Sequence, residues 1–78
     1  MSDYISPSPE ELKSLLYEIG LSRSETGKLA DVTGNKIGKW CSGDVMPYSV
    51  LFTIVAKSYK INISQKSWRE EIASFKNE

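Results

Sequence analysis

Histidine is absent from this chain of 78 residues, and cysteine occurs only once. Without histidine the chain lacks the most common general base of enzymes and the most common side-chain ligand of transition metals. The sequence also contains no phosphate-binding loop and no cluster of metal-ligand residues. We therefore expect a protein that is not an enzyme, binds no metal and needs no cofactor. Nothing in the sequence implies a small-molecule ligand.

Disulfides, long apolar runs and net charge are absent as well. The single cysteine, Cys41, cannot form an internal disulfide, which is typical of a cytoplasmic protein. The longest apolar candidate, residues 50–56, is far shorter than the roughly 18 residues of a membrane helix, so we expect no membrane association. Ten basic and ten acidic residues balance each other. This balance argues against unspecific coating of nucleic acid, but it allows a local basic surface.

Hydrophobic periodicity and capping signals predict five helices and no strand. A serine followed three residues later by glutamate predicts a capping box at Ser8, Ser22 and Ser67. Thr33 is a further candidate cap, and Pro47 suits the first turn of the remaining helix. The expected helices span about 9–19, 22–31, 33–42, 47–59 and the stretch after 67.

The second and third expected helices are joined by only three residues, 31–33, so their axes must cross steeply, as in a helix-turn-helix. Residues 21–43 read LSRSETGKLADVTGNKIGKWCSG. This stretch resembles the lambda-repressor-like (Cro/Xre-type) helix-turn-helix family without a gap. The matching features are a small residue early in the second helix, a turn hydrophobe, an N-cap, two inward anchors and a terminal glycine, which here are Gly27, Val32, Thr33, Ile37, Trp40 and Gly43.

The resemblance covers about residues 8–60 and implies an all-α, five-helix lambda-repressor-like domain. We expect residues 1–7 to form a flexible arm, residues 8–60 the DNA-binding core, and residues 61–78 a linker with a C-terminal helix that can serve in dimerisation.

The chain departs from the family pattern at three places. Asp31 stands where the family usually has glycine, although aspartate tolerates a left-handed turn position. The recognition helix carries Gly34 and Gly38, and a glycine inside a helix costs roughly 1 kcal/mol against alanine. These glycines reflect either sequence drift or a thin helix that approaches the DNA backbone closely. The loop at residues 44–46 is not basic, whereas many relatives place phosphate-binding residues there.

The recognition helix is predicted to have an apolar inner face and a polar outer face. The inner face holds Ile37, Trp40 and Cys41, and the outer face holds Asn35, Lys36, Lys39 and Ser42. An asparagine can bind adenine through two hydrogen bonds, and a lysine can donate to guanine acceptors. The resemblance implies base-facing positions at Gly34, Asn35 and Lys39, of which Gly34 can only permit close approach. It further implies contacts to the DNA backbone from Ser22, Arg23, Thr33, Lys36 and Ser42.

These expectations describe a sequence-specific regulator of transcription that binds double-stranded DNA. Residues 22–43, with four basic and two acidic side chains, hold the densest positive charge. By analogy with small phage and plasmid repressors, we expect an autoregulator of a phage, prophage or mobile-element operon that occludes a promoter. Two alternatives remain at this stage. The chain could be a protein-interaction module that has lost DNA binding, or an antitoxin that also binds a protein partner.

A homodimer on a palindromic operator is expected, because one recognition helix buries too little surface for tight specific binding. The predicted dimer interface consists of Trp68, Ile72 and Phe75. The alternative is that this face packs within one subunit, on a second apolar stripe of the fourth helix that contains Tyr48, Phe52, Ala56 and Tyr59.

Overall fold

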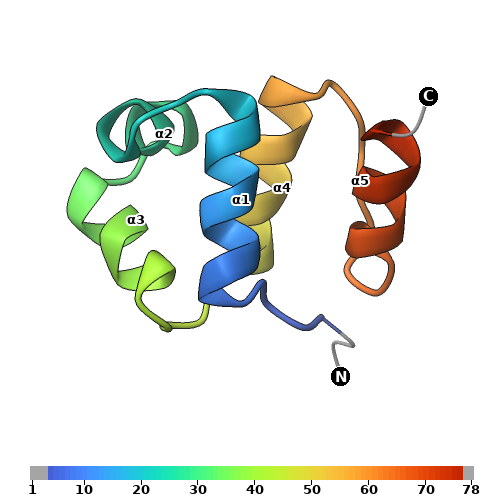
Figure 1. Ribbon diagram of the computed structural model, residues 1–78, viewed down its shortest axis with the longest axis horizontal. Coiled ribbons are helices and arrows are strands. Elements are labelled where there is room, and N and C mark those ends of the chain that lie inside the picture. The colour runs from blue at the N-terminus through green and yellow to red at the C-terminus, as the bar shows by residue number, and fades with distance from the viewer. Residues whose placement is uncertain (1–3, 77–78) are drawn as a thin grey trace.

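The computed structural model describes residues 4–76 and contains five α-helices, with no strand among these residues. The helices are α1 (Pro9–Ile19), α2 (Arg23–Ala30), α3 (Gly34–Cys41), α4 (Tyr48–Ser58) and α5 (Trp68–Lys76). Figure 1 shows α1 at the centre in front of α4, with α2 and α3 on one side and α5 on the other. The prediction of an all-α domain with five helices is confirmed.

Local hydrogen bonds determine where α1 and α2 begin. Ser8 and Ser22 each complete the predicted capping box with Glu11 and Glu25. In each box the serine Oγ accepts a hydrogen bond from the glutamate amide, and the glutamate carboxylate accepts one from the serine amide. At the end of α2, Asp31 adopts the left-handed conformation with φ 61° and ψ 41°. Aspartate therefore fills the turn position that more often carries glycine.

The turn between α2 and α3 brings the two helices into close contact. Thr33 Oγ1 accepts a hydrogen bond from the Lys36 amide and so caps α3. A Cβ atom built on Gly27 would lie 2.6 Å from the carbonyl oxygen of Val32 and 3.1 Å from the amide nitrogen of Gly34. Both neighbours are backbone atoms, which cannot move aside as a flexible side chain can. Glycine at position 27 therefore permits the close approach of α2 to the start of α3.

Replacing Gly27 with alanine is expected to lower the free energy of unfolding by about 1 to 3 kcal/mol, because the new methyl group overpacks the turn. Gly38→Ala is the matched control, since the closest atom to a Cβ there is Arg23 Nη1, at an ordinary contact distance of 3.5 Å. That variant should be as stable as the wild type or up to about 1 kcal/mol more stable. Urea denaturation followed by circular dichroism measures both. Equal stability of the two variants would contradict this account of Gly27.

The hydrophobic core takes buried residues from all helices except α2, which packs its half-buried Ala30 against the core and buries Thr26 and Gly27. It consists of Leu12, Leu15, Leu16, Ile37, Trp40, Cys41, Met46, Leu51, Ile54, Val55, Ile63, Trp68 and Ile72. Trp40 and Cys41 are buried, as the sequence predicted for the inner face of α3. The core therefore fixes α3 from one side only and leaves its other side on the surface.

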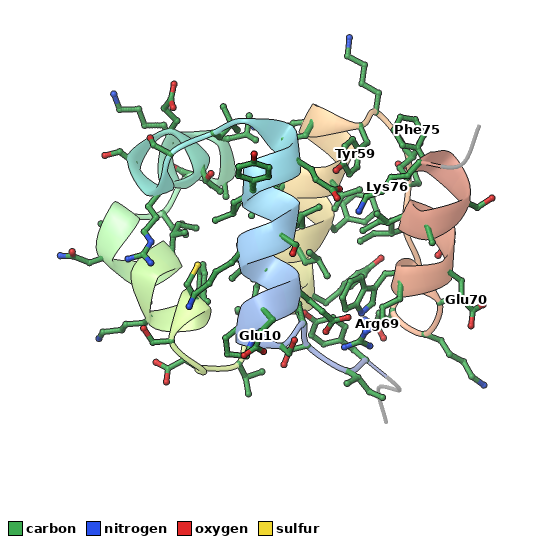
Figure 2. The ribbon with its side chains drawn as sticks, viewed as in Figure 1. Glu10, Tyr59, Arg69, Glu70, Phe75 and Lys76 are labelled. Atoms are coloured by element: carbon green, nitrogen blue, oxygen red, sulfur yellow. The ribbon has the colours of Figure 1, made fainter. Side chains whose placement is uncertain are left out.

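The C-terminal helix packs against the body of the same chain. Trp68 and Ile72 are each only 5% exposed, and the Phe75 ring lies 5.0 Å from the Tyr59 ring between centroids (Figure 2). Lys76 forms an ion pair with Glu18 of α1. In the structure, α5 thus packs within one subunit, which is the alternative to an arrangement across a dimer interface.

The predicted capping box at Ser67 and Glu70 is wrong. The Ser67 amide donates to Ser64 Oγ, so it is not bound to Glu70. The carboxylate of Glu71 instead accepts hydrogen bonds from the amide and the hydroxyl of Ser64, both at 2.8 Å. The residue that binds the glutamate at the start of α5 is therefore Ser64, in the preceding turn, three residues before the predicted Ser67.

The predicted flexible arm also differs from the structure. Residues 1–3 lie outside the described part of the chain, and residues 4–6 are held by three hydrogen bonds. Tyr4 Oη donates to the Met46 carbonyl at 2.7 Å, and burial raises the pKa of this phenol to about 12. Trp68 Nε1 donates to the Ile5 carbonyl, and Arg69 Nη2 donates to the Ser6 carbonyl. Residues 4–6 thus connect α5 with the loop that follows α3.

Candidate nucleic-acid interface

The residues predicted to contact DNA lie on the surface of α2 and α3. The exposed ones are Ser22, Arg23, Thr33, Asn35, Lys36, Lys39 and Ser42, and Gly34 is half-buried. Two neighbouring shallow depressions bring most of them together. The first is lined by Arg23, Asn35, Gly38, Lys39, Ser42 and Asp44, and the second by Arg23, Ser24, Thr33, Gly34, Asn35 and Gly38. Ser22 and Lys36 line neither depression.

The arrangement on α3 follows from the helical period. Asn35 and Lys39 are four residues apart, so they project from the same face one turn apart. Ile37 and Trp40, on the opposite side, are buried at 0% and 8% exposure. Because these apolar anchors are fixed in the core, the amide and the ammonium group are carried on a helix with a defined orientation.

The first turn of α2 presents backbone amides next to the start of α3. Within residues 4–76, the amide N–H groups of Arg23 and Ser24 have no hydrogen-bond acceptor. A Cβ atom on Gly34 would lie 3.6 Å from the Ser24 nitrogen, so a longer side chain at this position would cover that amide. Free N–H groups at a helix N-terminus attract anions such as phosphate. Gly34 therefore keeps a potential phosphate site open.

The Arg23 side chain extends from α2 across the surface of α3. Its Nη1 atom lies 3.5 Å from the position that a Cβ of Gly38 would occupy. No acidic side chain or other hydrogen-bond acceptor binds the guanidinium within the described part of the chain. A cation with free donors thus lies beside Asn35 and Lys39.

One acidic residue is part of this surface. Asp44 is exposed and lines the same depression as Lys39, and its amide donates to the Lys39 carbonyl at 3.2 Å. Its carboxylate lowers the positive potential at the C-terminal end of α3. The sequence indicated only that this loop lacks basic residues, and the position of Asp44 within the site could not be predicted from it.

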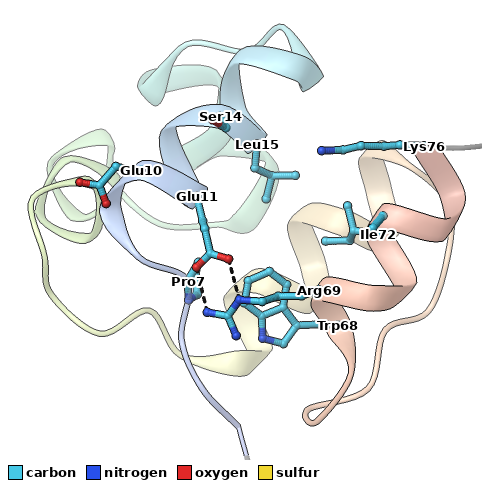
Figure 3. Close-up of a pocket in the computed structure, with 10 residues that line it drawn as sticks. Pro7, Glu10, Glu11, Ser14, Leu15, Trp68, Arg69, Ile72 and Lys76 are labelled. Carbon is cyan, nitrogen blue, oxygen red and sulfur yellow. Dashed lines mark hydrogen bonds and ion pairs between the residues drawn. The ribbon is translucent and has the colours of Figure 1, made fainter.

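A second concave surface lies between α1 and α5 (Figure 3). Its apolar floor includes Leu15, Trp68 and Ile72. The Arg69 guanidinium lies 4.3 Å from the centroid of the Trp68 ring and binds both carboxylate oxygens of Glu11, at 2.6 and 2.8 Å. The hydrogen bond from Arg69 is the main reason why the pKa of Glu11 falls to about 2. Two ion pairs, Arg69–Glu11 and Lys76–Glu18, thus join α5 to α1 at this surface.

Stability should depend on pH through Glu11. Its carboxylate has a lower pKa in the folded chain than the ordinary 4.5, so its stabilisation is present above pH 4.5 and is lost as the pH falls towards 2. Because the side chain is 38% exposed, solvent screening reduces the expected loss to about 1 kcal/mol.

The variant Glu11→Gln keeps an acceptor for the Ser8 amide but removes the charge. Its unfolding free energy should therefore fall about 1 kcal/mol less than that of the wild type between pH 4.5 and 2. Glu25→Gln is the matched control, since Glu25 forms the same capping box in α2 but no ion pair with arginine. Urea titrations at several pH values measure the difference. Identical pH profiles for Glu11→Gln and the wild type would contradict the prediction.

The predicted dimer residues have different exposures. Trp68 and Ile72 belong to the core of the single chain, whereas Phe75 is 38% exposed and its ring is in tilted contact with the Tyr59 ring (Figure 2). Of the three, only Phe75 retains substantial surface for a second subunit.

Comparisons with protein-family models, curated proteins and solved structures return no match. Among residues 4–76, no group of three or more cysteine, aspartate and glutamate side chains is arranged to hold a metal ion. None of the helices in the described residues is long and apolar enough to cross a membrane.

Proposed function

We propose that this chain is a sequence-specific regulator of transcription that binds double-stranded DNA through a lambda-repressor-like helix-turn-helix, formed by α2 and α3. The observation that carries the proposal is the convergence of Arg23, Asn35 and Lys39 on the outer side of α3. None of these three side chains has an ion-pair or hydrogen-bond partner among the described residues. Unpaired polar donors on a helix anchored by its other face are what recognition in the major groove requires.

In the proposed complex, α3 lies in the major groove. Asn35 contacts an adenine edge and Lys39 donates to guanine acceptors, while Gly34 permits close approach. Phosphates bind the free amides at the start of α2 and the ammonium group of Lys36. The hydroxyls of Ser22 and Thr33 accept hydrogen bonds from helix amides, so each can still donate its hydrogen to a phosphate. Ser42 lies at the other end of α3, where its hydroxyl donates to the Gly38 carbonyl at 3.0 Å, so its proposed backbone contact requires the hydroxyl to rotate from Gly38 to a phosphate.

The biological role follows from this mode of binding. The proposed regulator responds to its own concentration and represses by covering a promoter. We propose an autoregulator of a phage, prophage or mobile-element operon, located in the cytoplasm. The neutral net charge limits unspecific affinity, so specific contacts must supply most of the binding energy.

A homodimer is part of the proposal, because two recognition helices about 34 Å apart can read both halves of a palindromic operator. Light scattering is expected to give about twice the chain mass of 8.8 kDa, either in the free protein or on DNA. Phe75→Asp should weaken dimerisation and operator binding, whereas Tyr17→Asp, at an 87% exposed position on α1, should change neither. A wild-type protein that is monomeric both free and on DNA would contradict the dimer and the palindrome.

Selection of bound duplexes from a random library tests the proposed function. A palindromic consensus is the expected result. Recovery of no preferred sequence would refute sequence-specific binding. It would favour the alternative, a helix-turn-helix module or antitoxin that binds a protein, for which the exposed Asp44 beside Lys39 is the supporting observation.

A further inference from the structure

We infer that Arg23 of α2 reads a guanine base in the major groove, alongside Asn35 and Lys39, and that its guanidinium is not a phosphate contact. This inference rests on the proposed function and changes the role expected for Arg23 from the family resemblance. It adds a base-reading side chain from outside the recognition helix.

The position of the guanidinium is the first reason. A Cβ atom on Gly38 would be in ordinary contact with Arg23 Nη1, at 3.5 Å. The guanidinium therefore lies against the surface of α3 itself. Arg23 lines both depressions on this surface, and so do Asn35 and Gly38. Any element that occupies these depressions would meet the guanidinium between the two ends of α3.

The two glycines of α3 provide the second reason. Gly34 and Gly38 are four residues apart, so they form a strip without side chains along one face of the helix. Gly34 lies against the backbone of Ser24, and Gly38 lies under the Arg23 guanidinium. A glycine at position 38 costs the helix roughly 1 kcal/mol against alanine. The structure indicates a role for Gly38 that offsets this cost: a large side chain at position 38 would displace the Arg23 guanidinium from α3.

The donors of Arg23 provide the third reason. The guanidinium has no ion-pair or hydrogen-bond partner within residues 4–76, so its planar pair of N–H groups is free. This fork matches the O6 and N7 acceptors of guanine, which arginine binds more often than any other base edge. A phosphate bound at the start of α2 would not need this side chain, since the amides of Arg23 and Ser24 are free to bind it.

The test compares Arg23→Lys with the wild type in the same selection from a random duplex library. Lysine keeps the positive charge but loses the planar fork. We expect the wild-type consensus to contain a guanine whose preference disappears in Arg23→Lys, with about tenfold or greater loss of affinity for the consensus site. The slope of affinity against salt concentration should stay unchanged, because the number of charges is the same.

Two further variants distinguish base reading from other effects. Gly38→Leu should lose preference at the same base pair, because its side chain displaces the guanidinium. Lys36→Ala is the matched control for a phosphate contact, and it should keep the complete consensus while weakening all sequences and flattening the salt dependence. Circular dichroism checks that each variant is folded. Because Arg23 is exposed, its replacement should leave the fold intact.

The outcomes separate this inference from the proposed function. A consensus that Arg23→Lys retains at every position would overturn base reading by Arg23 and leave the DNA-binding proposal standing. A wild-type protein that selects no sequence would overturn both.

Discussion

Replacing Trp40 with alanine is expected to lower the free energy of unfolding by about 3 to 5 kcal/mol, which removes most or all of the stability of a domain of this size. Trp40 is 8% exposed and belongs to the core, on the inner face of α3. Its loss leaves a large cavity next to Ile37, the other inward anchor of α3. The variant should therefore lose its fold together with any DNA binding.

Urea denaturation and near-ultraviolet circular dichroism measure the effect of Trp40→Ala. Tyr17→Ala is the matched control, because Tyr17 is an aromatic residue that is 87% exposed on α1. Its replacement should change stability by about 0.5 kcal/mol or less. A Trp40→Ala protein that is fully folded and has lost only DNA binding would show that Trp40 acts at the interface and not in the core.

The second large effect is expected at Lys39. Lys39→Ala should weaken binding to the preferred site by about 1 to 3 kcal/mol and relax the sequence preference at one base pair. The physical reason is that Lys39 has no acidic partner within the described residues and projects beside Asn35 into the same depression. The free energy of unfolding of Lys39→Ala should equal that of the wild type, because the Lys39 side chain is exposed.

Fluorescence anisotropy with the selected duplex and with single-base variants of it measures the effect of Lys39→Ala. Lys13→Ala, on an exposed position of α1, is the control for the loss of one positive charge and should keep both the affinity and the consensus. An unchanged consensus in Lys39→Ala would contradict the assignment of a base contact to this residue.

Helix positions could be predicted from the sequence wherever the determining interactions are local. The capping boxes of α1 and α2 each join residues three positions apart, so their signals stand together in the sequence. The start of α5 at residue 68 was predicted correctly, but its capping interaction was not, because this hydrogen bond spans seven residues, from Ser64 to Glu71, across a turn. Such a bond depends on how the turn folds, and no short sequence pattern specifies it.

The attachment of the N-terminal segment could not be predicted for a similar reason. The hydrogen bond from Tyr4 to Met46 spans 42 positions, and the one from Trp68 to Ile5 spans 63. Only the tertiary structure brings these groups together. Two prolines and the lack of periodicity made the segment resemble a loose arm.

The candidate interface was predicted in its composition but not in its arrangement. Helical periodicity was sufficient to place Asn35 and Lys39 outside and Ile37 inside, and their exposures agree. The contact between Arg23 and Gly38 joins two helices and so depends on the tight turn between them. The sequence did show two glycines four residues apart, Gly34 and Gly38, in a short helix. This pattern alone does not reveal that the Arg23 side chain lies against Gly38.

The hydrogen bonds of residues 4–6 determine which residues a chimeric or affinity-tagged form of this domain must retain. They link α5 to the carbonyl of Met46, in the loop that follows α3. Residues 8–60 therefore do not contain all the contacts that fix this loop. A chimeric protein that received only these residues would lack Tyr4, which donates to the Met46 carbonyl, and α5, which binds residues 5 and 6. A chimera should keep residues 4–76 together, and an affinity tag is better separated from Tyr4 by a spacer.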